Sequence, residues 1–215
     1  MGCFLTNSSL GRKLVMSISG CFLVLFILFH MSMNVVAIFS AEAYNMICGF
    51  LGASWYALAG TAVLALGVLV HFAYAFWLTW QNRKARGADR YAVTARPKGV
   101  EWSSQNMLVL GIVVLAFLAL HLYQFWAKMQ LVEITSHGIE GWHQYEGASV
   151  PPTAGTLFIQ EVFSQWWVVV AYLVGFIALW FHMTHGFWSM FQSIGWDSTA
   201  WIPRLKKISD WWTTI

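Results

Sequence analysis

Four long runs of apolar residues alternate with shorter polar stretches along the chain. The runs cover residues 14–39, 55–80, 106–126 and 162–191, and the first holds 26 residues without one Asp, Glu, Lys or Arg. A helix needs about 20 apolar residues to cross the hydrocarbon core of a bilayer. The pattern therefore predicts an all-α integral membrane protein, with four transmembrane helices forming one domain over residues 1–215.

Composition supports a membrane protein and excludes several kinds of site. The chain is 59% hydrophobic and 10% charged, whereas soluble domains are about 25% charged. The three cysteines show no CxxC spacing, which argues against an iron–sulfur cluster, a structural zinc site or a covalently attached c-type haem. No glycine-rich phosphate-binding motif follows a predicted strand, so we expect no nucleotide or flavin binding by this chain.

The positions of the basic residues predict how the chain is oriented. Of the 12 Lys and Arg residues, all but Lys128 lie before the first run, in the loop at 81–101, or after residue 191. Lys and Arg are enriched in cytoplasmic loops. Both termini are therefore expected on the cytoplasmic side, with a short loop at 40–54 and the longest connection, at 127–161, on the outer side.

Each apolar run contains a histidine at a depth that pairs it with another. His30 and His121 fall in the outer halves of their helices, and His71 and His182 fall in the inner halves, at about 1.5 Å of helix rise per residue. Ionisable residues inside a membrane are costly and usually functional. A single buried histidine is more often a packing residue, but four paired by depth favour metal ligation.

Two histidines from facing helices can hold one six-coordinate haem iron in the core of a bundle. The pairs His30/His121 and His71/His182 are therefore predicted as axial ligands of two b haems. We expect small residues to let the macrocycles approach the helices: Ser17, Ser19, Gly20, Gly60, Gly67, Gly111, Gly175 and Gly186.

Each of the three further histidines has two possible roles. His185 follows His182 by about one turn, and is either an accessory that binds a haem propionate or a polar residue near the cytoplasmic interface. His137 and His143 flank Glu140 in the longest connection, where a metal site and a solvated loop are both open interpretations. Part of that connection is expected to form a short surface helix.

The segment FHMTHGFWSMF resembles the fourth-helix motif of a known family, the di-haem cytochrome b subunits of succinate:quinone oxidoreductases. Its features are the ligand His182, then Gly186, then the aromatic Trp188. FILFHMSMN, VLVHFAYAFW and LALHLYQFW resemble the segments around the other three ligands, and IPRLKKIS resembles the basic segment before the family's last helix. The resemblance covers nearly the whole chain.

The resemblance implies a function and partners. A flavoprotein subunit and an iron–sulfur subunit would dock at the cytoplasmic face, and this chain would anchor them and exchange electrons with a membrane quinone, expected to be menaquinone. His71 and His182 would hold the haem nearer the iron–sulfur subunit. The chain itself would carry no dicarboxylate catalytic site, would lie in a bacterial cytoplasmic membrane, and would belong to a complex that could form a homodimer.

The chain departs from the family pattern at two places. Some members carry a carboxylate two residues before the fourth-helix ligand, where this chain has Trp180, so that proton route is not expected. The family has a fifth spanning helix after the basic segment. ISDWWTTI is either its first turns or an amphipathic segment at the interface.

The quinone site is least defined by the sequence. Glu42, Tyr44 and Asn34 lie near the outer end of the first helix, and Glu42 is a candidate proton donor to the quinone or simply an interfacial charge. A haem b subunit of another quinone-linked enzyme, such as a hydrogenase or formate dehydrogenase, is the alternative function. A haem-free transporter is a third, but all four prolines lie outside the apolar runs, so no broken helix is predicted.

Overall fold

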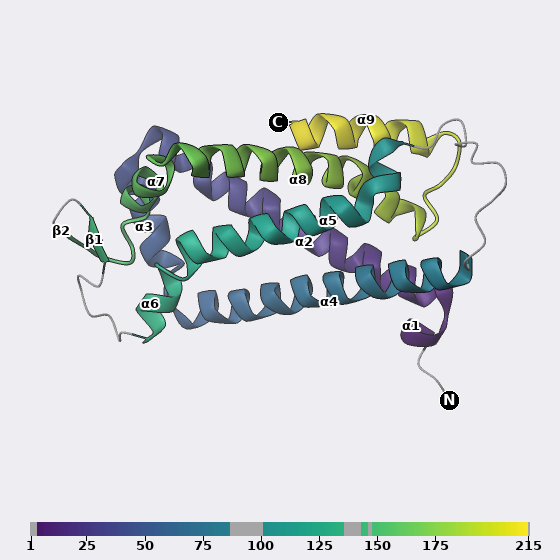
Figure 1. Cartoon of the computed structure of the whole chain (residues 1–215), viewed down its shortest axis with the longest axis horizontal. Coiled ribbons are helices and arrows are strands. Elements are labelled where there is room, and N and C mark those ends of the chain that lie inside the picture. The colour runs from purple at the N-terminus through teal and green to yellow at the C-terminus, as the bar shows by residue number, and fades with distance from the viewer. Residues whose placement is uncertain (1–3, 87–100, 136–142, 146–147, 215) are drawn as a thin grey trace. The chain divides into compact units, whose positions relative to one another are not determined.

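The structure, a computed structural model, describes residues 4–86, 101–135, 143–145 and 148–214 (Figure 1). Four of its helices are long and apolar enough to cross a membrane. They are α2 (Ser9–Phe39), α4 (Trp55–Arg86), α5 (Trp102–His121) with the π-helix η1 (Leu122–Trp126) that continues it, and α8 (Trp166–Gln192). The prediction of an all-α membrane protein with four spanning helices is confirmed at this level.

The helix ends differ from the ends of the apolar runs. The helix α2 begins at Ser9 and includes Arg12 and Lys13, and α5 begins at Trp102 rather than Asn106. A helix is defined by its backbone hydrogen bonds, while the apolar run marks only the part that lipid would surround. Polar first turns therefore extend α2 and α5 beyond the sequence-based limits. Helix α8 instead begins at Trp166, later than the predicted start at Val162, because Val162 and Phe163 end the preceding helix.

The connection at 40–54 is mostly helical, so its prediction as a short loop was wrong. Helix α3 (Ala41–Phe50) begins after Ser40, whose hydroxyl accepts a hydrogen bond from the backbone N–H of Ala43 at 3.1 Å. Serine at this position satisfies one of the free N–H groups of a first turn. Glu42 follows in that turn, where a negative charge suits the helix dipole.

The connection at 127–161 contains two short helices and a hairpin. Helix α6 (Gln130–Thr135) comes first, and strands β1 (His143–Tyr145) and β2 (Ala148–Val150) pair antiparallel with His143 opposite Val150. Helix α7 (Gly155–Phe163) follows and buries Phe158, which is 1% exposed. The predicted surface helix is thus present, but α7 contributes to a hydrophobic core.

The chain divides into two compact units. Unit 1 holds Met1–Leu25, Ala65–Val113 and Ile177–Ile215, and unit 2 holds Phe26–Leu64 and Val114–Phe176. Each of the four long helices contributes residues to both units. His71 and His182 therefore belong to unit 1, and His30 and His121 to unit 2.

Helix α9 (Trp201–Thr214) runs antiparallel to the second half of α8 within unit 1 (Figure 1). The fully buried hydroxyl of Ser209 donates to the carbonyl of Thr184 at 2.6 Å. Nearer the end of α9, the indole N–H of Trp180 donates to the Thr214 hydroxyl at 3.1 Å. Helix α9 thus packs along α8 rather than only against its last turn.

Unit 2 is held together by polar and apolar contacts between its connections. The carboxamide of Gln130 accepts from the Thr61 hydroxyl at 2.9 Å and from the Trp126 indole at 2.8 Å, and donates to the Gly52 carbonyl at 2.9 Å. A hydrophobic cluster of Val150, Ala154 and Phe158 packs against Phe125, Met129 and Leu157. These contacts fix the connections around the helix ends.

Candidate functional sites: two histidine pairs

In unit 1, His71 of α4 faces His182 of α8. Their ring centroids are 6.4 Å apart, and the ring planes make an angle of 67°. Helix α2 approaches His71, since a Cβ atom on Gly20 would lie 3.5 Å from the Cε1 atom of that ring. Helix α5 approaches His182 in the same way, at 3.8 Å from Gly111. Both distances are ordinary van der Waals contacts, so the helix faces at Gly20 and Gly111 border the pair.

The two rings of this pair differ in their hydrogen bonds. The Nδ1 atom of His71 lies 3.1 Å from the hydroxyl of Ser19, which is 7% exposed. The Nδ1 atom of His182 is buried and has no hydrogen-bond partner among the described residues. A buried polar atom without a partner costs about 1–3 kcal/mol, so it is a feature that calls for an explanation.

In unit 2, His30 of α2 lies beside His121, the last residue of α5. Their ring centroids are 5.7 Å apart, and the planes are nearly perpendicular at 89°. The Nδ1 atom of His121 is 3.3 Å from the hydroxyl of Tyr172 on α8. Aromatic rings surround the pair, with Phe26 stacked on His30 and Phe117 and Phe125 beside His121. Tyr172 also contacts His121 through its ring, and it brings the one hydroxyl among these four aromatic neighbours.

Both pairs fit the axial ligand set of a haem. Two imidazoles on opposite sides of one metal ion, each at about 2 Å as for other metal–imidazole bonds, need rings separated by a few ångströms, and both pairs show such separations. In each pair, one ring has its Nδ1 atom beside a hydroxyl, which leaves Nε2 for a metal. A ligating histidine usually holds its other nitrogen in this way.

Two histidines are the number of protein ligands that a bis-histidine haem would take. Among the described residues, no group of three or more His, Cys, Asp or Glu side chains could hold an ion. Structural zinc takes four protein ligands, whereas a bis-histidine haem iron takes only two from the protein because the macrocycle supplies the others. Ligation itself stays a prediction.

His185 lies in a charged cluster and not in either pair. Its Nδ1 atom is 3.3 Å from Oε2 of Glu101, and Oε1 of the same carboxylate is 2.6 Å from the Lys206 ammonium. Burial raises the pKa of Glu101, but the hydrogen bonds and charges of Lys206 and His185 outweigh it, so that the pKa lies below its usual value. Its predicted role as an accessory to a haem propionate stays a prediction.

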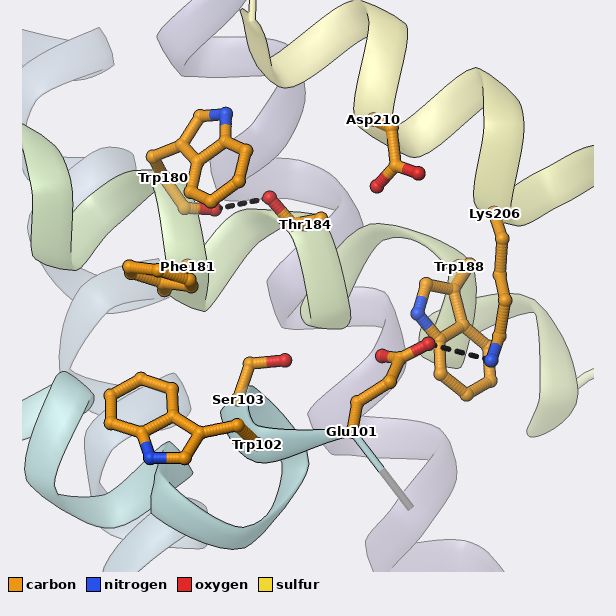
Figure 2. Close-up of a pocket in the computed structure, with 9 residues that line it drawn as sticks. All are labelled: Glu101, Trp102, Ser103, Trp180, Phe181, Thr184, Trp188, Lys206 and Asp210. Atoms are coloured by element: carbon orange, nitrogen blue, oxygen red, sulfur yellow. Dashed lines mark hydrogen bonds and ion pairs between the residues drawn. The ribbon is translucent and has the colours of Figure 1, made fainter. Parts of the chain in front are cut away.

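This cluster borders a pocket between α5, α8 and α9, with a volume of about 220 Å³ (Figure 2). Glu101, Lys206 and Asp210 supply its charged side, and Trp102, Trp180 and Phe181 are among its aromatic walls. The Lys206 ammonium also lies 4.4 Å from the ring centroid of Trp188. The charges are therefore largely used in joining α9 to its neighbours.

The residues suggested for quinone binding are only partly brought together. Glu42 is exposed in the first turn of α3. Tyr44 is 8% exposed and donates to Asn34 Oδ1 at 2.9 Å, while Asn34 donates to the carbonyl of His30 at 2.8 Å. Burial raises the pKa of the Tyr44 phenol, as does the charge of Cys48. Tyr44 and Asn34 thus connect to the backbone of a predicted ligand, and Glu42 stands outside this chain of bonds.

The remaining predicted residues fall elsewhere. His137 and Glu140 lie outside the described residues, and His143 begins strand β1. Two of the small residues have aromatic neighbours in the space beside them. A Cβ on Gly67 would lie 2.6 Å from the Phe22 ring, and one on Gly175 would collide with Phe117. These two glycines admit aromatic side chains, while Gly60 and Gly186 face open space.

Three features of the sites were missed by sequence reasoning. Ser19 was expected only as a small residue, and its bond to His71 depends on the rotation of α2, which no periodicity in an all-apolar helix shows. Tyr172 carried a usable signal, because it is a polar aromatic within an apolar run. The bonds of Glu101 join residues far apart in sequence, so only the fold brings them together.

Comparison of the chain with protein-family models, curated proteins and solved structures finds no match. The features that indicate a function are therefore the arrangement of the histidines and the sequence motifs around them.

Proposed function

We propose that this chain is the membrane-anchoring di-haem b subunit of a succinate:quinone oxidoreductase, a succinate dehydrogenase or fumarate reductase. It would pass electrons between an iron–sulfur subunit and a membrane quinone, expected to be menaquinone, in a bacterial cytoplasmic membrane. One observation carries the proposal. Each of the four candidate spanning helices supplies one histidine to the pairs, and these four rings form two close pairs.

The protein's own contribution would be to hold and surround two haems. His71 and His182 would ligate the haem nearer the cytoplasm, and His30 and His121 the haem nearer the outer side. Haem supplies reversible one-electron transfer when bound. The apolar rings around His30 and His121 would exclude water, and burial is one of the factors that set a haem's reduction potential.

The choice of partners is supported by motif and charge. FHMTHGFWSMF and the basic segment IPRLKKIS resemble the anchor subunits of this enzyme family. Basic residues outside the spans concentrate on the predicted cytoplasmic side, where flavoprotein and iron–sulfur subunits would dock. Such charges also orient membrane proteins in general. The motif therefore supports these partner subunits more strongly than the charge does.

The first test is the haem content of the purified chain. We expect two b-type haems per polypeptide by pyridine haemochrome assay and a low-spin reduced-minus-oxidised spectrum. His182→Ala and His30→Ala should each remove about one haem, because each breaks a different pair. His137→Ala is the matched control, and it should retain both. A wild-type chain without haem would contradict the proposal.

The second test separates this function from that of another quinone-linked cytochrome b. The tagged chain should co-purify from its native membrane with a covalent-flavin subunit and an iron–sulfur subunit, and the complex should reduce a quinone analogue with succinate or oxidise a quinol with fumarate. Co-purification with a hydrogenase or formate dehydrogenase subunit would instead support the alternative, with the haem content unchanged.

A further inference from the structure

The Ser19 hydroxyl makes two hydrogen bonds in unit 1, and together they determine a proton position. Its oxygen lies 3.0 Å from the backbone carbonyl of Met16 and 3.1 Å from Nδ1 of His71. A hydroxyl has one proton to donate and lone pairs that can accept. A carbonyl only accepts, so both bonds can form at once only when the Ser19 proton is directed to Met16.

The bond between Ser19 and His71 must then run in the opposite direction. With its proton committed to Met16, the serine oxygen acts as acceptor, and the Nδ1 atom of His71 must carry the proton that it donates. In a neutral imidazole only one nitrogen is protonated. Nε2 of His71 is therefore left with a free lone pair, as a metal ligand requires.

We infer that Ser19 is a positioning residue that fixes His71 in the Nδ1–H tautomer and presents its Nε2 atom to the haem. The inference rests on the proposed function, because it gives a role to one ligand of the inner haem. Ser19 would act through His71 and would not touch the iron.

The other histidines show that this arrangement is particular to His71. Among the described residues, the Tyr172 hydroxyl beside His121 has no second acceptor that would commit its proton, so its bond can run in either direction. The Nδ1 atom of His182, in the same pair as His71, has no partner among the described residues. The two histidines that would hold the inner haem therefore differ in their hydrogen bonds. Ser19 supplies an acceptor to Nδ1 of His71, and His182 has no corresponding partner among the described residues.

Loss of the hydroxyl should change both the affinity and the potential of the inner haem. An acceptor on Nδ1–H raises the basicity of the ligating nitrogen, and removing such outer-shell partners typically costs about 10–100-fold in metal affinity. A more basic ligand favours ferric over ferrous iron. A loss of about tenfold in that preference raises the one-electron midpoint potential by about 59 mV.

The test uses two substitutions of nearly equal size. Ser19→Thr keeps the hydroxyl, and Ser19→Val replaces it with a methyl group, so packing changes are shared and only the acceptor differs. Ser32→Ala is the matched control, because it removes from the same helix a hydroxyl that donates to a backbone carbonyl, that of Leu28 at 2.7 Å. Potentiometric titration and low-spin EPR are recorded on the full complex, with the inner haem identified as the signal lost in His182→Ala.

Ser19→Val should raise the potential and shift the EPR signal of the inner haem only, while Ser19→Thr and Ser32→Ala leave both near wild type. Equal signals and haem retention in the Val and Thr variants would overturn the role of Ser19 and leave the proposed function intact. A wild-type protein without haem would overturn both. If Ser19→Val does not accumulate while Ser19→Thr carries two haems, Ser19→Ala gives the same comparison with less added bulk.

Discussion

The Oε1 atom of Glu101 lies 2.6 Å from the Nζ atom of Lys206, so the residue before α5 is bonded to α9. The two side chains are 34% and 35% exposed. An ion pair with that much access to water is worth about 0.5 kcal/mol. Its effect should therefore be seen in the local opening of α9 more readily than in global unfolding.

We expect Glu101→Gln and Lys206→Met each to increase amide hydrogen exchange in α9 by about twofold, the factor that about 0.5 kcal/mol allows. The measurement is exchange mass spectrometry on the protein in lipid nanodiscs. The double variant should exchange no faster than either single variant, because the pair is already broken. Additive effects in this cycle would show that the two residues act separately.

The docking of α9 should also depend on pH through Glu101. Its pKa is lowered in the folded protein, so its contribution to stability is present above the unfolded pKa of about 4.5 and is lost as pH falls through the lower folded value. Exchange in α9, corrected for intrinsic rate, should therefore increase below pH 4.5. Glu101→Gln should show no such increase, and an equal increase in both proteins would point to another group.

Gly155 is predicted to tolerate no side chain. A Cβ atom there would lie 2.5 Å from Sγ of Cys48 and 2.8 Å from Cε1 of Tyr44, so α3 and α7 would have to separate. Gly155→Ala should lower the free energy of unfolding by about 1–3 kcal/mol, the usual cost of overpacking. Thermal unfolding in detergent, followed by circular dichroism, measures it.

Gly60→Ala is the control for this substitution, since a Cβ atom there meets nothing within 4 Å. Alanine is a better helix former than glycine by up to about 1 kcal/mol. The control should therefore be neutral or stabilising. A Gly155→Ala protein as stable as the control would show that α3 and α7 are not closely packed.

Gln130 is predicted to be the most sensitive polar residue of unit 2. Gln130→Leu would leave the Trp126 indole, the Thr61 hydroxyl and the Gly52 carbonyl without their partner. Unmet buried groups cost about 1–3 kcal/mol each, so we expect a loss of at least about 2 kcal/mol in detergent unfolding. Gln160→Leu, at an exposed position of α7, should cost less than about 0.5 kcal/mol.

The sequence was most informative where lipid dictates the pattern. Four apolar runs predicted four candidate spanning helices, and the depths of His30, His71, His121 and His182 predicted the same pairs that lie together in the structure. The sequence was less informative for the connections between those helices. Helix α3 was missed although Ser40 and Glu42 form a helix start signal, because the segment is short and flanks a long apolar run.

Hydrogen bonds between helices could not be predicted from the sequence, for a physical reason. In helices that are apolar on every side, no polar stripe marks which face is turned inward. The contact of Ser19 with His71 and that of Tyr172 with His121 depend on those rotations. Depth can be counted along a helix, but rotation about its axis needs the packed structure.

The π-helical turn after His121 makes the orientation of the residues that follow it depend on the number of residues in that turn. The backbone N–H of Ala127 bonds to the carbonyl of Leu122 at 2.8 Å, so η1 holds one residue more than α-helical turns would need. Deleting one residue here would restore a regular helix and rotate everything after it by about 100° relative to His121. Gln130 would then be present but turned away from Thr61 and Gly52. Deleting a residue of η1 would therefore have the same effect as losing hydrogen bonds of the Gln130 side chain.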